Sequence, residues 1–353
     1  MTMLPGLLPG VTARRVPTAR LTVNVLSVEG RDDGEPVVLV HGNVSSAADW
    51  QEAMLALPPA YRPLALDLRG FGGTDAAPVD ATRGLRDYAD DVVATLGALG
   101  VDRAHLVGWS TGGGVVLHLL RERVSRVRTA TLVNPVSPYG FGGTRLDGSL
   151  TDPSGAGSGA GAANPEFVDR IAAGDTSDDG PLAPRNVFLS AYVTRGFVPP
   201  RLEDHVASML STVVGDGNYP GDRVAADVWP NVRPGTRGIL NAMAPTHFRV
   251  DDLDALDEKP PVLWIRGAGD VIVSDASLFD LANLGKLGVV PGWPGEEVAP
   301  PQPMLAQTRA VLDRYAAAGG VYREVVMDDA AHSPHIERPA AFAAALVEGM
   351  AAG

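Results

Sequence analysis

Short runs of Val, Leu and Ile alternate along this chain with stretches whose apolar residues recur at helical spacing, and this alternation constrains the fold more than any other feature. A strand buried on both faces reads as a continuous apolar run, whereas a helix that covers a sheet shows a single apolar stripe. The expected strands are residues 21–28, 36–41, 61–68, 104–109, 127–133, 262–266 and 321–327, and the expected helices of the same core are 85–99, 111–124, 302–318 and 339–350. The pattern predicts an α/β fold with a mostly parallel, doubly wound sheet.

Two long segments interrupt the alternation. Residues 137–259 separate two expected core strands, where a few linking residues and one helix normally suffice. This segment opens with a glycine-rich stretch and then shows helical patterns at 165–173, 184–193, 201–213 and 236–244. We therefore expect residues 137–259 to form an inserted helical cap on a single core made of residues 1–136 and 260–353. A second insertion, 274–320, is rich in proline and glycine near its middle, and no role is predicted for it.

Composition excludes several classes of function. The chain has no cysteine, which removes disulfides, thiolate metal sites and cysteine nucleophiles together. The formal charge is −13 and the arginines are scattered among acidic residues, so the sequence argues against nucleic acid and anionic membranes as partners. These features favour a small, neutral substrate. They imply no metal and no cofactor, and they leave a homodimer open.

Targeting segments are not expected in this sequence. The first residues place apolar side chains before Arg14 and Arg15, which is the wrong order for a secretion signal. The longest uncharged run, residues 104–120, contains three consecutive glycines and is shorter than the roughly 20 apolar residues that a membrane span needs. We expect a cytoplasmic protein with no membrane span.

The sharpest local motif is Gly108-Trp109-Ser110-Thr111-Gly112. A G-x-S-x-G pattern is weak by itself, and an ordinary glycine-rich turn is the alternative interpretation. Here the motif follows an expected strand and opens an expected helix, which is the setting of a nucleophile elbow. A Cβ at either glycine would collide with the strained turn that exposes Ser110 beside the positive end of the helix dipole.

A serine hydroxyl is a poor nucleophile unless a histidine, itself oriented by a carboxylate, removes its proton. His332 follows the strand at 321–327, at the edge of the sheet where ligands gather, and is the predicted base. His335 lies three residues later, and spacing does not exclude it. Asp270 follows the strand at 262–266 and a glycine turn, and it is the predicted carboxylate. The alternative for Asp270 is a loop residue that caps the next helix.

The negative oxygen of a tetrahedral intermediate needs two backbone N–H donors. Thr111, which follows the nucleophile, is predicted to supply one. Asn43, in the loop after the strand that ends near residue 40, is predicted to supply the other, with Val44 as the alternative, while His41 braces this loop. Val44, Trp109 and Val271 are predicted to contact the substrate. Several large side chains of the cap could line an apolar site or could simply be core: Phe188, Tyr192, Phe197, Tyr219, Trp229 and Met243.

Five motifs in this order carry a family resemblance: His41-Gly42-Asn43, the turn 67–72, Gly108 to Gly112, Gly267 to Asp270, and His332-Ser333-Pro334 with Glu337 and Pro339. On these residues the chain resembles the α/β-hydrolase fold superfamily, in its capped type that groups with haloperoxidase-like and epoxide-hydrolase-like enzymes. The resemblance implies a sheet of the α/β-hydrolase type, and a cap that roofs the pocket and supplies much of the specificity. The chain order Ser110, Asp270, His332 is the order of that fold.

Three positions need comment within this resemblance. Members that open epoxides use aspartate as nucleophile, and this chain has Ser110 there, which argues against that reaction. The separation between Asp270 and His332 is longer than the family usually shows, because of the second insertion. Some relatives carry the acid after the preceding strand, but that strand ends at Asn134, whose amide cannot replace a carboxylate.

The sequence therefore favours a serine hydrolase that cleaves a carboxylic ester or lactone of a small, largely apolar substrate through an acyl-enzyme. Perhydrolysis in the haloperoxidase-like manner and carbon-carbon bond hydrolysis use the same triad and are the alternatives, because the fold does not choose among them. A homologue that binds a ligand without turnover is the alternative from a different class.

Overall fold

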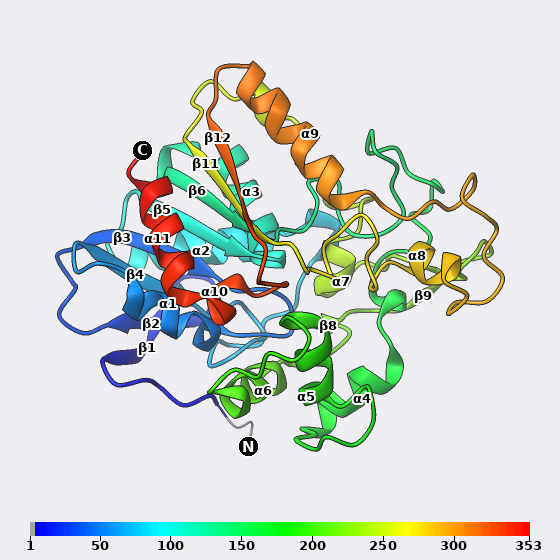
Figure 1. Ribbon diagram of the computed structural model, residues 1–353, viewed down its shortest axis with the longest axis horizontal. Coiled ribbons are helices and arrows are strands. Elements are labelled where there is room, and N and C mark those ends of the chain that lie inside the picture. Colours follow the sequence, from blue (N-terminus) through cyan, green and yellow to red (C-terminus); the bar gives the residue numbers. More distant parts are fainter. Residues whose placement is uncertain (1–3) are drawn as a thin grey trace.

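A central sheet of eight strands runs through the computed structural model, which describes residues 4–353 (Figure 1). The strand order is β1-β2-β4-β3-β5-β6-β11-β12, where β1 and β2 pair antiparallel, β2 and β4 pair antiparallel, and all other neighbours are parallel. The strands are β1 (Val11–Pro17), β2 (Thr22–Val28), β3 (Glu35–Val40), β4 (Tyr61–Leu66), β5 (Ala104–Trp109), β6 (Val127–Val133), β11 (Val262–Gly267) and β12 (Tyr322–Met327). The predicted mostly parallel sheet is confirmed. Residues 1–3, with which the expected core begins, lie outside the described residues.

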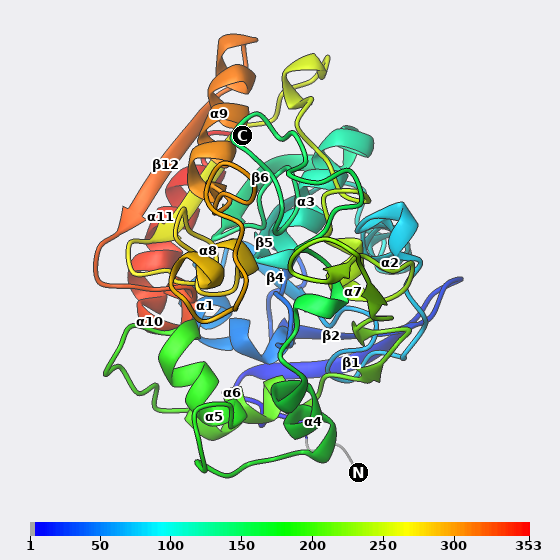
Figure 2. The ribbon, with the colours of Figure 1, turned by 90° about the vertical axis from the view of Figure 1, so that its right-hand side faces the viewer.

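Helices cover both faces of this sheet (Figures 1 and 2). Helices α1 (Gln51–Ala56) and α11 (Pro339–Met350) pack together on one face, and α2 (Arg86–Ala98) and α3 (Thr111–Glu122) pack together on the other. Helix α9 (Met304–Ala317) packs against β12. All six residues of β5 are buried, as the continuous apolar run predicts for a strand covered on both sides. The sheet is therefore doubly wound.

Strand β1 is the one strand of the sheet that the sequence pattern did not predict. Only Val11 and Val16 of its seven residues are buried, and the four residues between them are exposed. This pattern has neither the continuous apolar run nor the alternation by which a strand is recognised. The strand nevertheless pairs with β2 along its whole length at the edge of the sheet, where Arg14 and Arg15 discourage pairing with another chain.

The segment between β6 and β11 adds no strand to the eight-stranded sheet in the described part of the chain. It contains α4 (Pro165–Ala173), α5 (Pro184–Val187), the π-helix η5 (Phe188–Tyr192), α6 (Leu202–Leu210) and α7 (Ile239–Ala242). It also holds two small sheets, β7 (Val214–Gly215) with β8 (Tyr219–Pro220) and β9 (Val224–Ala225) with β10 (Val232–Arg233). In Figure 1 these elements lie beyond the carboxyl edge of the central sheet.

Two short helices complete the fold. Helix α8 (Leu281–Lys286) lies in the second insertion, and α10 (Pro334–Glu337) directly precedes α11. The indole N–H of Trp229 donates to the carbonyl of Pro291 at 2.9 Å, so the two insertions contact each other. Of the helices within residues 4–353, none combines the length and the hydropathy that crossing a membrane requires.

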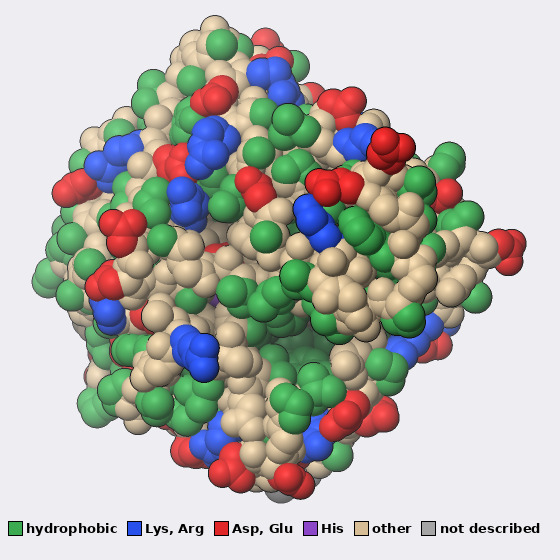
Figure 3. Space-filling view, turned by 45° about the vertical axis from the view of Figure 1, so that its right-hand side comes forward, with side chains coloured by type: hydrophobic (Ala, Val, Ile, Leu, Met, Phe, Trp, Pro, Cys, Tyr) green, Lys and Arg blue, Asp and Glu red, His purple; other side chains and the backbone are tan. Residues whose placement is uncertain are grey.

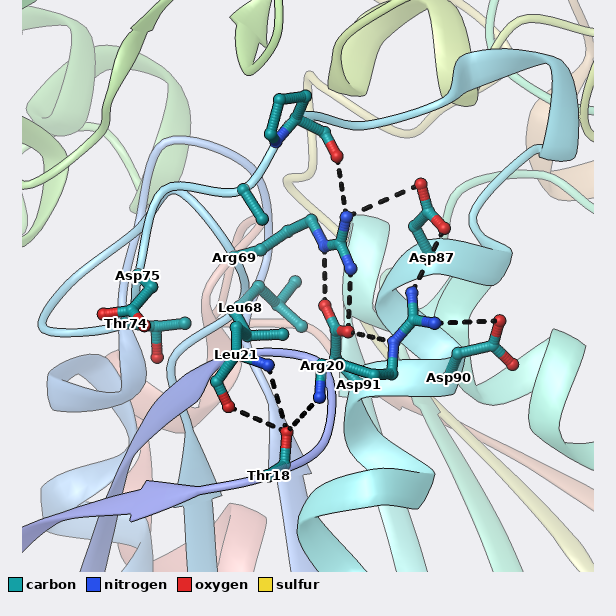
Figure 4. A network of polar contacts seen from close by, with 12 residues as sticks. Thr18, Arg20, Leu21, Leu68, Arg69, Thr74, Asp75, Asp87, Asp90 and Asp91 are labelled. Atoms are coloured by element: carbon teal, nitrogen blue, oxygen red, sulfur yellow. Dashed lines mark hydrogen bonds and ion pairs between the residues drawn. The ribbon is translucent and has the colours of Figure 1, made fainter.

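A buried network of ion pairs fastens the turn after β4 to helix α2 (Figure 4). Arg69 donates from Nε and Nη2 to the two oxygens of Asp91, at 2.6 and 2.8 Å, and Arg20 donates to the same carboxylate at 2.6 Å. The side chains of Arg69 and Asp91 are only 6% and 4% exposed. Burial makes each charge costly, and the bidentate hydrogen bonds between Arg69 and Asp91 offset this desolvation cost.

We expect Asp91→Asn to lower the free energy of unfolding by about 3 kcal/mol, because the buried Arg69 loses its bidentate partner and keeps only the longer contact with Asp87, at 3.6 Å. The matched control is Arg15→Gln at the exposed Arg15–Asp75 pair, where we expect a loss below about 1 kcal/mol. Urea denaturation of the three proteins measures both effects. Equal losses in the two variants would contradict the importance assigned to the buried pair.

Candidate active site

Ser110 lies in the turn between β5 and α3, in a backbone conformation that non-glycine residues rarely adopt, with φ 56° and ψ −118°. A Cβ on Gly108 would lie 2.2 Å from the carbonyl oxygen of Gly112, and a Cβ on Gly112 would lie 2.2 Å from that of Val40. Neither position accepts a side chain. The N–H of Ser110 donates to the carbonyl of Val133 on β6 at 2.9 Å, which fixes the turn to the sheet.

Asp270 and His332 meet at the ends of two neighbouring parallel strands, β11 and β12. Nδ1 of His332 lies 2.9 Å from Oδ2 of Asp270, and both side chains are buried. The other carboxylate oxygen of Asp270 accepts the N–H groups of Ile272 and Val273, at 2.7 and 3.0 Å, so the carboxylate cannot rotate freely. Because Nδ1 faces Asp270, Nε2 is the nitrogen of His332 left to exchange a proton.

The loop that carries His332 is held by two side chains from the neighbouring strands. The amide Nδ2 of Asn134 donates to the carbonyls of Ala331 and His332, at 3.0 and 2.8 Å, and its Oδ1 accepts the N–H of Gly267. The indole N–H of Trp109 also donates to the carbonyl of His332, at 2.8 Å. The residue next to Ser110 therefore contacts the His332 loop directly.

Glu337 connects the same loop to the inserted segment. Its Oε1 accepts the N–H of Ala331 and its Oε2 accepts the N–H of Thr194, each at 2.7 Å. The sequence marks Glu337 only through the family resemblance. Its role and that of Asn134 depend on bonds to backbone groups far away in the chain, which no local pattern reveals.

His335, the alternative base, lies in very different surroundings. Its ring is fully buried between Trp50, at 4.1 Å between ring centroids, and Trp109, at 4.6 Å. Neither ring nitrogen has a hydrogen-bond partner within residues 4–353. Burial, with smaller contributions from His205 and His332, lowers the pKa of His335 well below its usual value. The ring is thus a neutral member of an aromatic stack.

The loop after β3 passes close to Ser110. A Cβ on Gly42 would lie 2.9 Å from Cβ of Ser110, so only glycine allows this approach. His41 lies 2.7 Å through Nδ1 from the carbonyl oxygen of Gly42, while its Nε2 accepts the N–H of Leu68 at 2.9 Å. Nδ1 therefore carries the proton and donates to Gly42. Burial lowers the pKa of His41, and its neutral ring braces the loop from the side of the core.

The amides of Asn43 and Thr111 are both available for an oxyanion. Within residues 4–353, neither backbone N–H donates a hydrogen bond to another group of the protein. Asn43 belongs to the loop after β3, and Thr111 is the first residue of α3. Val44, the alternative to Asn43, has a positive φ of 47°.

The predicted substrate contacts differ in burial, and two of the large side chains of the insertion lie close to residues of the candidate site. Val44 and Trp109 are buried, and Val271 is half-buried. The ring edge of Tyr192 approaches His332, with 5.8 Å between centroids, and the Thr111 hydroxyl lies 3.0 Å from Sδ of Met243.

The other large side chains of the insertion lie elsewhere. Phe188 stacks behind Tyr192, Phe197 lies under Arg338, Tyr219 is buried in the insertion, and Trp229 bonds to the second insertion. Figure 3 shows hydrophobic side chains gathered around a hollow on this side of the molecule. No cluster of three or more His, Asp or Glu residues within 4–353 has the geometry to hold a metal ion.

The comparison with known families covers most of the chain. The family model described as alpha/beta hydrolase fold matches residues 35–302. The putative carbamate hydrolase RutD of Variovorax paradoxus is 44% identical over 108 residues, which are 30% of this chain and 40% of that protein. Epoxide hydrolase A of Mycobacterium tuberculosis is 29% identical over 350 residues, which are 94% of this chain and 97% of that protein.

Solved structures resemble the whole chain in fold. The esterase EaEST from Exiguobacterium antarcticum superposes with a TM-score of 0.59 at 16% identity and covers 96% of this chain and 100% of its own. The first curated relatives, in contrast, are matched over only about 40% of their own length.

The buried, neutral His335 predicts a measurable pH dependence of stability. Between its ordinary pKa of about 6.5 and its lowered folded pKa, the unfolded chain binds a proton that the native protein does not. Stability must therefore fall as the pH falls below about 6.5, and this one residue should account for about 2 kcal/mol between pH 8 and pH 5.

Between pH 8 and pH 5, the free energy of unfolding of His335→Leu should fall by about 2 kcal/mol less than that of wild type. Urea denaturation at both pH values measures this difference. Phe342→Leu removes a non-titrating ring that also packs on His335, and it should retain the wild-type pH dependence. The same pH dependence in all three proteins would show that His335 titrates normally in the native state.

Proposed function

The chain belongs to the alpha/beta hydrolase fold family, and we propose that it is a serine hydrolase that cleaves a carboxylic ester or lactone of a small, largely apolar substrate. The observation that carries this proposal is the 2.9 Å contact between Asp270 and His332, on a loop that Trp109 ties to the elbow of Ser110. A nucleophile, a base and a group that orients the base are the parts that acyl transfer requires.

In the first half of the proposed reaction, Oγ of Ser110 attacks the carbonyl carbon while Nε2 of His332 accepts the hydroxyl proton. Asp270 keeps the proton on Nδ1 and stabilises the imidazolium that forms. His332 then gives its proton to the departing alkoxide, which leaves as the alcohol. In a lactone the alcohol stays attached to the acyl group.

The tetrahedral intermediate carries a negative oxygen, for which the amides of Asn43 and Thr111 are the proposed donors. Each such donor is typically worth about 10²–10³-fold in kcat. In the second half, His332 activates a water molecule that attacks the acyl-enzyme, and the returned proton restores Ser110. Both halves use the same five groups.

The proposed substrate class follows from the side chains nearest these groups. Val44, Trp109 and Val271 are the proposed substrate contacts, and Tyr192 and Met243 of the insertion lie close to His332 and Thr111. None of these side chains carries a charge, so they suit an apolar acyl or alcohol group. We propose that residues 137–259 act as the cap over this site.

Two kinds of relative bear on the chemistry through their names. The resemblance to esterases of known structure is consistent with acyl transfer, although at their identity it shows only the fold. Epoxide hydrolase A matches nearly the whole chain, but opening an epoxide through an alkyl ester needs a carboxylate nucleophile, and this chain has Ser110 at the elbow. We therefore do not extend that activity to it.

We expect the protein to hydrolyse p-nitrophenyl esters of short acyl chains. Ser110→Ala should lower kcat by more than about 10³-fold. Asp270→Asn should cost about 10⁴-fold, because an amide favours the wrong tautomer of His332. His335→Leu is the matched control and should stay within about fivefold of wild type.

An organophosphate should label the wild type and not Ser110→Ala. Labelling that persists in that variant would contradict the assignment of the nucleophile. Lactones, acetate with hydrogen peroxide, and a vinylogous 1,5-diketone form the parallel assays. Turnover of either of the last two without ester cleavage would favour perhydrolysis or carbon-carbon hydrolysis on the same triad.

A further inference from the structure

We propose that Tyr192 is a positioning residue for the oxyanion loop: its hydroxyl, contributed by the insertion, holds the Asn43–Val44 peptide, which directly follows the proposed donor amide of Asn43, and so keeps the loop in the conformation that the site needs. The inference rests on the proposed function, because it concerns the loop that would stabilise the oxyanion. The hydroxyl of Tyr192 donates to the carbonyl oxygen of Asn43 at 3.1 Å.

The loop after β3 presents two successive carbonyls, and each is anchored from a different side. The carbonyl of Gly42 accepts hydrogen bonds from His41 and from the hydroxyl of Ser45, at 2.7 and 2.8 Å, both from the core. The carbonyl of Asn43 is bonded by Tyr192 of the insertion. Because a peptide unit is planar, a bond to its carbonyl also sets the direction of the N–H on the other side. The core thus orients the amide of Asn43, and the insertion orients that of Val44.

The backbone at Val44 explains why this second anchor is needed. Val44 has a φ of 47°, in a region that β-branched residues avoid because Cβ crowds the backbone. A residue in such a conformation persists only when its surroundings hold it there. Val44 is buried, and the Tyr192 hydroxyl is the side-chain donor to the peptide that precedes it. The side-chain oxygen of Asn43 has no partner among the described residues and adds no further anchor.

Tyr192 is itself held in place by a chain of contacts that ends in the core. Its ring stacks on Phe188, with 5.6 Å between centroids, and Phe188 stacks on His205 at 5.1 Å. His205 lies on α6 and approaches Asp49 of the core through Nδ1 at 2.7 Å. Asp49 also accepts the hydroxyl of Ser208, at 2.7 Å. The position of the Tyr192 hydroxyl therefore depends on how α6 is seated on the core.

The hydroxyl of Tyr192 keeps its proton in this environment. The side chain is buried, and burial raises the pKa of Tyr192 far above its usual value. The residue therefore remains a hydrogen-bond donor at neutral pH. Through this bond, the geometry of the loop after β3 depends on the position of the insertion. Removal of the Tyr192 hydroxyl therefore impairs the site without removing any reacting group.

The test is Tyr192→Phe, which deletes the hydroxyl and keeps the ring in its stack. We expect kcat for p-nitrophenyl esters to fall about 10- to 100-fold while KM changes less than about threefold, because the loss acts on the transition state. Tyr219→Phe is the matched control, since Tyr219 is buried in the same insertion and, among the described residues, its hydroxyl forms no hydrogen bond with the loop; its kcat should match wild type.

The split between kcat and KM distinguishes this role from a general loss of packing, which would also disturb substrate binding and raise KM. Crystal structures of wild type and Tyr192→Phe give an independent readout. We expect φ of residue 44 to become negative in Tyr192→Phe.

A positive φ retained at Val44 in the Tyr192→Phe crystals would overturn the inference, whatever happens to kcat. An unchanged kcat in an otherwise active enzyme would also overturn it and would leave the proposed function intact. If wild type neither cleaves esters nor is labelled at Ser110, the proposed function fails, and the φ of Val44 in the two crystals alone decides the role of Tyr192.

Discussion

The close approach of backbone to backbone at the carboxyl ends of β3 and β5 is the constraint on which the rest of the site depends. The first turn of α3 passes so near β3 that a side chain on Gly112 would meet the carbonyl of Val40, and the loop after β3 passes so near the elbow that a side chain on Gly42 would meet Ser110. Gly42 and Gly112 make room for this contact. It brings the loop after β3, which carries Asn43, next to the elbow that carries Ser110 and Thr111.

Much of this architecture could be predicted from the sequence, because β5 and β11 are buried almost throughout and read as apolar runs. Ser110, Asp270 and His332 each follow an expected parallel strand, and parallel strands end at the same edge of a sheet. Strand β1 was not predicted, because its exposed arginines interrupt the apolar pattern by which a strand is recognised. Asn134, Glu337 and Tyr192 could not be assigned roles, because each acts on a backbone group about 140 to 200 residues away in the chain. Spacing alone could not decide between His335 and His332. The structure distinguishes them, because His335 packs against aromatic rings whereas His332 contacts Asp270.

Buried polar contacts attach the inserted segment to the core near the site. Glu337 receives the N–H of Thr194, Asp49 receives His205 and Ser208, and the carbonyl of Asn43 receives Tyr192. Buried polar groups demand partners of defined direction, whereas apolar contacts tolerate sliding. An attachment of this kind fixes the insertion in one position relative to Ser110. Specificity for a substrate can then be built on the insertion without loss of alignment.

The distance between Asp270 and His332 is set by the register of β11 and β12, which pair from Val262 with Tyr322 to Gly267 with Met327. The long segment between the two residues, which contains α8 and α9, therefore has no part in bringing them together. The unusual length that the sequence shows there does not disturb the contact. In engineering terms, the irregular part of this segment is a natural graft point: a reporter domain or an affinity handle could be spliced into it while the two strands continue to hold Asp270 and His332 in register.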